Sequence, residues 1–166
     1  MRKAYFAGGC FWCITPPLRN LPGVNRVTSG YCGGCEEAPS YQAVKSQQTG
    51  HRETVCVEYD PAVLPYENLV KTFLDNVDPF DGGGQFIDRG HSYTLAIYWE
   101  TPEEEETANR CILQLEEEAC RKTAVAVEKA GTFWRAEEYH QNYDLKNPEA
   151  FEKELRESGR KDETHA

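Results

Sequence analysis

Hydrophobic and polar residues alternate with two different periods along the chain. In residues 53–59 apolar side chains occupy every second position from Val55 onward, which predicts a strand with one face in the core. In residues 65–77 large apolar side chains recur every three or four positions, which predicts an amphipathic helix. Glu53 lies on the apolar face of its strand, so we expect its carboxyl group to point toward the interior.

Shorter patterns complete the set of expected elements. Further strands are predicted at residues 4–7, 24–31, 93–99 and 124–128. A short helix is predicted at residues 17–21 and a short helix or turn at residues 136–145. A longer helix opens at Thr101, where Pro102 and Glu104 complete an N-terminal capping signal. Because strands and helices alternate with short connections, we expect an α/β (α+β) two-layer sandwich, with helices packed on one mixed sheet.

The length of 166 residues is close to that of one domain. No internal repeat or Gly/Ser linker divides residues 1–147, so we expect them to form a single domain. The stretch 148–166 is strongly charged and has few apolar residues beyond Phe151 and Leu155. It is expected to form a peripheral helix or tail with a loose end.

Charge and hydropathy narrow the possible partners. The formal net charge of −10 opposes the electrostatic attraction on which nucleic-acid binding depends. The apolar stretch at residues 4–7 is shorter than the core of a signal peptide, and nowhere do about 18 apolar residues run together, as a membrane span requires. We therefore expect a cytoplasmic protein that binds neither nucleic acid nor membrane and whose thiols stay reduced.

Seven cysteines are the next informative feature, because an odd number in a reducing compartment argues against a framework of structural disulfides. Cys10 follows the first predicted strand and a Gly-Gly pair, near a possible helix start, where backbone amides would lower the pKa of its thiol. Phe11 and Trp12 would supply an apolar wall for a substrate group. The alternative is that both rings fill the core and Cys10 is an inert buried thiol.

Two Cys-x-x-Cys pairs leave a choice between redox and metal chemistry. Cys10 and Cys13 have the spacing of a dithiol redox motif, in which one thiolate attacks and the other closes a disulfide. Cys32 and Cys35 form the second pair, 18 residues further on, which is also the spacing of a zinc site. A general dithiol oxidoreductase and a zinc-binding module therefore both remain open at this point.

An ordered series of motifs identifies a family. The series contains Gly9-Cys10-Phe11-Trp12, Leu21-Pro22-Gly23-Val24, Gly30-Tyr31-Cys32-Gly33-Gly34, Pro39-Ser40-Tyr41, Thr49-Gly50-His51-Arg52-Glu53-Thr54-Val55, Tyr59-Asp60-Pro61, Asp78-Pro79 and Tyr139-His140-Gln141. In this order the chain resembles the A-type peptide methionine sulfoxide reductases, which reduce the S epimer of methionine sulfoxide. The resemblance implies a ferredoxin-like core within the sandwich.

The resemblance also implies a role for each matching residue. Cys10 would be the nucleophile and Glu53 the acid. Five side chains would surround the substrate: Phe11 and Trp12 at the sulfoxide methyl group, Tyr41 and Tyr93 at its oxygen, and Asp88 beside it. No metal or organic cofactor is implied. The expected partners are free methionine sulfoxide or proteins that contain it, and thioredoxin or another thiol reductant, for an enzyme that is expected to be a monomer.

This set of residue types suits the reaction physically. A sulfoxide sulfur is a poor electrophile until its oxygen is protonated or strongly hydrogen-bonded, so the thiolate needs an acid opposite it. Burial would raise the pKa of Glu53 and keep it protonated near neutral pH. Without the family resemblance, Glu53 would read as an ordinary edge-strand acid, and Tyr41 and Tyr93 as core residues with surface hydroxyls.

Attack by Cys10 would leave a sulfenic acid, which condenses readily with a second thiol. Many relatives place that thiol in a glycine-rich C-terminal tail, which this chain lacks after Tyr143. The candidates are Cys13, either cysteine of the Cys32–Cys35 pair, or an external thiol.

Pro16 and Pro17 are a second departure from the family. Proline interrupts a helix, so these residues predict a helix that begins only at Pro16, capped by Thr15, with Cys10 outside it.

Overall fold

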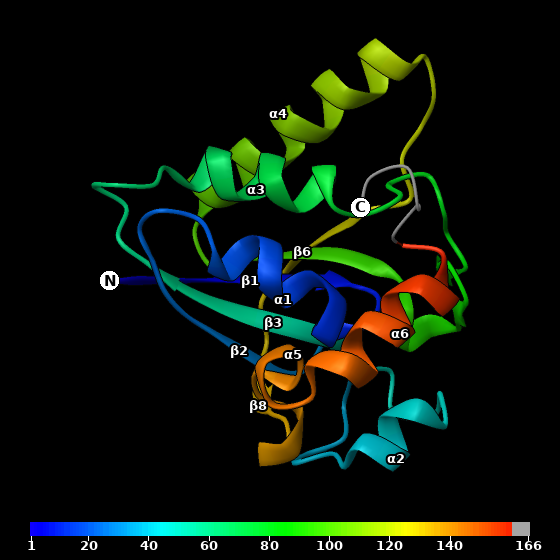
Figure 1. Cartoon of the computed structure of the whole chain (residues 1–166). Coiled ribbons are helices and arrows are strands. Elements are labelled where there is room, and N and C mark those ends of the chain that lie inside the picture. The colour runs from blue at the N-terminus through cyan, green and yellow to red at the C-terminus, as the bar shows by residue number, and fades with distance from the viewer. Residues whose placement is uncertain (161–166) are drawn as a thin grey trace.

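One six-stranded sheet organises the computed structural model, which describes residues 1–160 (Figure 1). Its strands are β1 (Arg2–Gly8), β2 (Val24–Cys32), β3 (Arg52–Tyr59), β6 (Leu95–Trp99), β7 (Ala126–Lys129) and β8 (Trp134–Arg135). They lie in the order β7-β6-β1-β3-β2-β8. Only the β6–β7 pair is parallel, and the other neighbours are antiparallel, so the sheet is mixed as expected.

The connections of the four central strands make the core ferredoxin-like. Helix α1 (Phe11–Arg19) joins β1 to β2, and helix α3 (Tyr66–Asp75) joins β3 to β6. Each of these β-α-β units leaves a gap of one strand, which a strand of the other unit fills with antiparallel pairing. The fold class predicted from the sequence is confirmed, and β1 lies at the centre with a partner on either side.

The remaining helices and turns surround this core. They are α2 (Tyr41–Lys45), α4 (Pro102–Ala119), α5 (Tyr143–Lys146), α6 (Pro148–Ser158) and the 3-10 turns η1 (His91–Tyr93) and η2 (Glu138–His140). A small hairpin, β4 (Gly84–Gln85) with β5 (Asp88–Arg89), stands apart from the main sheet. Within residues 1–160 no helix has the length and apolar character that a membrane crossing would need.

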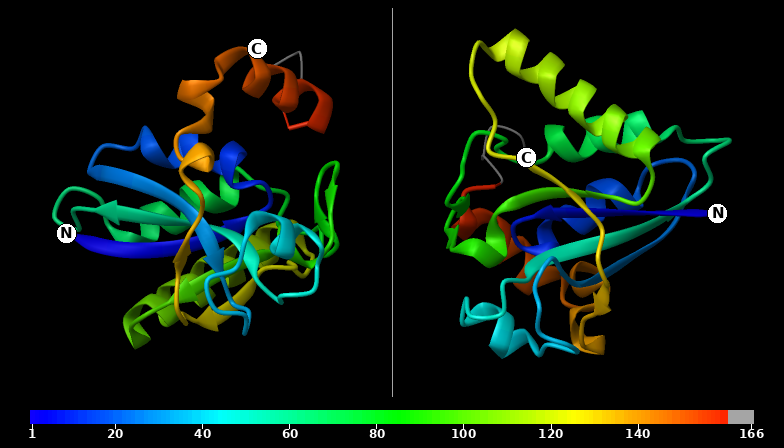
Figure 2. Two further views of the ribbon diagram at one scale, coloured as in Figure 1. Left: turned by 90° about the horizontal axis from the view of Figure 1, so that it is seen from below. Right: turned by 180° about the vertical axis from the view of Figure 1, so that it is seen from behind.

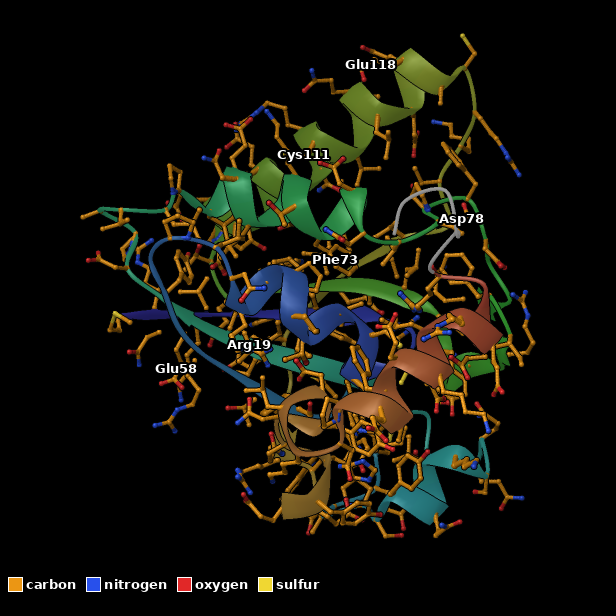
Figure 3. All side chains as sticks on the ribbon, viewed as in Figure 1. Arg19, Glu58, Phe73, Asp78, Cys111 and Glu118 are labelled. Carbon is orange, nitrogen blue, oxygen red and sulfur yellow. The ribbon has the colours of Figure 1, made fainter. Side chains whose placement is uncertain are left out.

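The main core lies between the sheet and helices α1 and α3. Phe73 of α3 lies on the side of the helix that faces the sheet (Figure 3). It stacks on Phe6 of β1 with 5.0 Å between ring centroids, and Val55 and Val57 of β3 are fully buried in the same core. Burying a side chain of this size contributes about 1.5–3 kcal/mol. The apolar face of the predicted helix at residues 65–77 is thus the face that α3 turns to the sheet.

A smaller cluster covers the opposite face of the sheet. It contains Ala7, Cys32, Ala96 and Tyr98, with Phe133 packed against them. The chain after β7 crosses this face on its way to β8, as the view from behind shows (Figure 2). Side chains of alternate residues on β1 and β2 therefore enter two separate environments.

Helix α1 begins earlier than the prolines predicted. It starts at Phe11 with Cys10 as its N-terminal flanking residue and includes Pro16 and Pro17, so the expected helix at residues 17–21 and the start at Pro16 are wrong. Thr15 does not cap the helix; its hydroxyl donates to the Phe11 carbonyl at 2.6 Å. Burial of apolar side chains throughout the helix offsets the hydrogen bonds that two prolines remove near its C-terminal end.

The strand expected at residues 93–99 begins only at Leu95. The residues before it form η1, in which the Tyr93 amide donates to the Gly90 carbonyl at 3.0 Å. Gly90 has φ +120°, a conformation that glycine adopts without strain. This local turn moves Tyr93 out of the sheet register and toward the end of β1.

Candidate active site

Cys10 is fixed at the end of the central strand. Chain direction changes at Gly9, whose φ of +84° is in the left-handed region, and α1 begins at the next residue but one. A side chain at Gly9 would lie 2.5 Å from Nη2 of Arg160 and 2.7 Å from Cβ of Gln85, so the space beside it is filled. The thiol at Cys10 is only 6% exposed.

Glu53 lies directly beneath the start of α1. It begins the buried face of β3, is 1% exposed, and accepts a hydrogen bond from the Phe11 backbone N–H at 3.2 Å. The pKa of Glu53 is raised to about 8. Burial is the largest cause, the hydrogen bond from the Phe11 N–H group opposes it in part, and the charge of Asp88 adds to the increase. At neutral pH the carboxyl group is therefore mainly protonated, as expected from the sequence.

The two thiols of the first pair interact directly. The hydrogen bond with Cys13, burial and the nearby charges of Cys13, Glu53 and Asp88 raise the pKa of Cys10 well above its usual value. The hydrogen bond from Cys10 lowers the pKa of Cys13 although burial opposes it, and Arg160 lowers it further. The expectation that helix amides lower the pKa of Cys10 is wrong for this arrangement, because these groups raise the pKa of Cys10 and lower that of Cys13.

Aromatic rings enclose the first turn of α1. The Trp12 indole donates to Nδ1 of His140 at 3.1 Å and stacks on Tyr143 with 3.9 Å between centroids. The His140 ring also contacts Phe11 and Tyr41, at centroid distances of 5.1 and 4.4 Å. Burial lowers the pKa of His140, so the ring remains neutral and its Nδ1 can accept the hydrogen bond from the indole N–H group.

Tyr41, Tyr93 and Asp88 converge on the same region. Burial and the nearby Glu53 carboxyl group raise the pKa of both phenols, so both keep their protons. The charges of Asp88 and Cys10 also act on Tyr93. Burial raises the pKa of Asp88, although the cations of Arg160 and Lys45 oppose this. The eight residues singled out in the sequence therefore lie in one neighbourhood.

Glu137 is a residue of this region that the sequence did not reveal. Its carboxylate accepts from the Tyr31 hydroxyl at 2.9 Å and from the Tyr41 backbone N–H at 2.9 Å. Burial acts to raise its pKa, but these two hydrogen bonds, a third from its own backbone N–H and the nearby His140 together leave the pKa lowered. Nothing local in the sequence marks Glu137, because Tyr31 and Tyr41 are 106 and 96 residues away.

The helix expected to be peripheral instead covers the thiols. Phe151 of α6 is 9% exposed and packs in one cluster with Cys10 and Cys13, and Leu155 lies against that cluster. The charged pattern of α6 hid this contact, which depends on a single large apolar side chain. The division of the chain at residue 147 stays a prediction, as does the loose end expected for the stretch 148–166, whose last six residues lie outside the described part of the chain.

The second cysteine pair does not meet the first. Cys32 is fully buried on the opposite face of the sheet, where Tyr98 donates to its carbonyl at 3.3 Å, and Cys35 is exposed. In the part of the chain that the structure describes, no group of three His, Cys, Asp or Glu side chains is arranged to hold a metal ion. The alternative of a zinc module built from both pairs is therefore wrong.

Known proteins match this chain over most of its length. The family model described as "Peptide methionine sulfoxide reductase" matches residues 2–166. The chain belongs to this family. The peptide methionine sulfoxide reductase MsrA of Bacillus velezensis is 46% identical over 150 residues, which cover 89% of this chain and 85% of that protein. MsrA of Bacillus subtilis is 43% identical over 159 residues, which cover 95% and 90%.

Solved structures of the reductase family agree with the fold. Mxr1 from Saccharomyces cerevisiae in reduced form matches with a TM-score of 0.84 at 26% identity, covering 89% of this chain and 86% of that chain. A structure of Mxr1 in complex with Trx2 matches with a TM-score of 0.58 at 17% identity, covering 86% and 84%. Both the family resemblance and the fold class predicted from the sequence are thereby confirmed.

Proposed function

We propose that Cys10, Glu53 and Cys13 together reduce methionine S-sulfoxide, free or in proteins, to methionine. The observation that carries the proposal is the buried, mainly protonated carboxyl group of Glu53, held beside the thiol by the Phe11 N–H group. An acid in this position supplies the proton that a sulfoxide oxygen needs when a thiolate attacks its sulfur. General acid assistance of this kind is worth roughly 10²–10⁴ in rate.

The first step uses the proton arrangement of the thiol pair. The Cys10 proton passes along the hydrogen bond to Cys13, and the resulting Cys10 thiolate attacks the sulfoxide sulfur. The sulfur–oxygen bond breaks and the oxygen is transferred to Cys10. The Cys10 sulfur supplies the two electrons that reduce the substrate to methionine, and Cys10 becomes a sulfenic acid. Glu53 donates the proton that neutralises the developing oxygen anion.

The surrounding side chains bind and orient the sulfoxide. Phenols of Tyr41 and Tyr93, which keep their protons, donate to the oxygen as its charge develops. Phe11 and Trp12 form the apolar wall for the methyl group and keep water away from the sulfur. Asp88 borders the substrate on the side of the β4–β5 hairpin.

Cys13 is the resolving thiol in this mechanism. It hydrogen-bonds with Cys10, whereas Cys32 is on the far side of the sheet. The Cys13 sulfur attacks the sulfenic sulfur, water leaves, and a Cys10–Cys13 disulfide forms. A dithiol reductant then returns both cysteines to thiols and is itself oxidised. Thioredoxin fits this role, as the solved complex of Mxr1 with Trx2 supports for that relative.

The proposed place of action is the cytoplasm. All seven cysteines are free thiols, and the first pair must be reduced again in every turnover. Cytoplasmic thiol reductants meet this requirement.

A single-turnover experiment tests the proposal. Reduced protein is mixed with one equivalent of each epimer of methionine sulfoxide without reductant, and methionine and new disulfides are measured by mass spectrometry. We expect about one methionine per chain from the S epimer and a Cys10–Cys13 disulfide. Cys10→Ser should form no methionine, whereas Cys13→Ser should form it more slowly, because Cys10 has lost its proton acceptor, and should accumulate a trappable sulfenic acid. Cys35→Ser is the matched control, and full activity of Cys10→Ser would disprove the mechanism.

A further inference from the structure

Helix α6 lies on the side of the sheet that carries α1, near the end at which α1 begins (Figures 1 and 2). Its Phe151 side chain is buried in one hydrophobic cluster with Cys10 and Cys13 and is itself only 9% exposed. The two thiols are only 6% and 7% exposed, and Glu53 is 1% exposed. The sulfur of a substrate must come into contact with Cys10, so the reacting position is closed while α6 lies there.

The C-terminal end of α6 is attached to β1, the strand that ends two residues before the nucleophile. Gly159 ends the helix in a left-handed conformation, and Nη2 of Arg160 then donates to the Gly8 carbonyl at 2.8 Å. The Arg160 guanidinium also lies over the Phe86 ring, 4.9 Å from its centroid. Its Nε is buried without a hydrogen-bond partner in the described residues, which weakens this attachment.

The apolar contacts of α6 are concentrated at one residue. Apart from Phe151, Ser158 is the one buried residue of the helix within residues 148–158, and Leu155 is partly buried. Two ion pairs of the helix, Lys153–Glu157 and Arg156–Glu152, are exposed and join residues of the helix itself. Pairs of this kind contribute little to stability and nothing to docking. Among the described residues, Phe151 is therefore the largest apolar side chain that α6 buries beside the thiols.

We propose that Phe151 is a specificity-determining residue that occupies the place of the substrate side chain and has to be displaced before a sulfoxide reaches Cys10. This inference rests on the proposed function of Cys10. Phenylalanine and the methionine side chain are both apolar and similar in reach, so each can fill the space between the thiols and the aromatic wall. Sulfoxides on flexible chains displace the helix readily, whereas a sulfoxide held on a rigid surface has no room beneath α6.

The effect of Phe151 on substrate binding can be measured as a fold-change in KM. When the binding-competent state is a minor one, the apparent dissociation constant rises in proportion to its rarity. Burial of one phenylalanine makes an open state about 10- to 100-fold rarer. Phe151→Ala should therefore lower KM for methionine sulfoxide by about this factor and change kcat much less, because Phe151 has already left the site when the sulfoxide is bound.

Alkylation of the thiols tests the cover without using the reductase activity. Reduced wild-type and Phe151→Ala proteins are treated with iodoacetamide, and the modification of each cysteine is followed by peptide mass spectrometry. We expect the Cys10–Cys13 pair to react about 10- to 100-fold faster in the variant. Exposed Cys35 and Cys120 should react equally in both proteins, and buried Cys32 should stay protected in both, which shows that the fold is intact.

Phe133→Ala is the matched control, because it removes the same side chain from the opposite face of the sheet and should not expose Cys10. Leu155→Ala provides a milder variant on α6 if Phe151→Ala does not fold. Equal alkylation of Cys10 in wild type and in a folded α6 variant would overturn the inference. Faster alkylation with no methionine formed by any of the proteins would instead support the cover and reject the proposed function.

Discussion

At the scale of single residues, the register of two strands determines the chemistry of Glu53. Pairing of Glu53 with Tyr31 puts the carboxyl group on the helix-facing side of the sheet, where the Phe11 N–H group reaches it. A one-residue shift would turn it to the other face. The protonated acid therefore depends on the same alternation that buries Val55 and Val57.

The pH dependence of the reaction follows from the pKa of about 8 for Glu53. The acid form is present below this value and is lost as the pH rises through it, so the rate of methionine formation should fall above about pH 8. Glu53→Gln should lower the rate by roughly 10²–10⁴ at pH 7 and remove this limb of the profile. Single-turnover rates between pH 6 and 9.5 measure both effects, and a variant that kept the limb would exclude Glu53 as the acid.

Glu137 and Glu138 are adjacent acids with very different surroundings. Glu137→Ala leaves the hydroxyl of fully buried Tyr31 without its partner and should cost about 1–3 kcal/mol of the free energy of unfolding. It should also raise KM, because Tyr41 loses the bond that positions its backbone.

Glu138→Ala is the matched control, since within residues 1–160 the carboxylate of Glu138 forms exposed ion pairs alone, with Arg135 and Lys146. Urea unfolding and sulfoxide kinetics compare the two variants. Equal loss of stability in both would show that the buried bridge has no special value.

At the scale of elements, α4 begins at the signal that its sequence predicts. Thr101 accepts a hydrogen bond from the Glu104 N–H at 3.2 Å, and Pro102 occupies the first turn. Thr101→Ala should reduce the free energy of unfolding by about 1 kcal/mol. Thr107→Ala, inside the same helix, should be neutral or stabilising because alanine favours helix. Urea denaturation distinguishes them, and an equal effect of both changes would argue against the cap.

Long, periodic elements were predictable because their burial pattern is local. The strand at 53–59 and the helix at 65–77 appear as β3 and α3 with small changes of boundary. Short elements were not predicted, among them α2, β8 and the β4–β5 hairpin. Distant contacts hold these in place, such as the hydrogen bond from the first residue of α2 to Glu137.

The residues of the active site also differ in whether the sequence alone could predict them. The motif around Cys10 and the strand position of Glu53 could be read from neighbouring residues. The partnership of Glu137 with Tyr31 and the cover formed by Phe151 join residues more than 100 positions apart. No short-range pattern in the sequence contains that information.

At the scale of the whole molecule, the neutral Glu53 makes stability depend on pH. Its pKa is raised in the folded state, so its contribution is fully present below its unfolded value of 4.5 and is lost as the pH rises through about 8. At roughly 1.4 kcal/mol for each pH unit, the loss approaches about 5 kcal/mol. Glu53→Gln does not titrate, so its melting temperature relative to wild type should increase from pH 5 to pH 9. A constant difference across that range would contradict the raised pKa.

The two ends of the described chain differ in their distance from the thiols. Met1 is 71% exposed and precedes β1, which runs the full length of the sheet before it reaches Gly8 (Figure 1). The Arg160 guanidinium, in contrast, donates a hydrogen bond to the backbone carbonyl of Gly8. An affinity handle or fluorescent fusion attached shortly after Arg160 would disturb contacts of the residues beside the nucleophile. Attachment ahead of Met1 is the position for immobilising or labelling the enzyme without altering its reactivity.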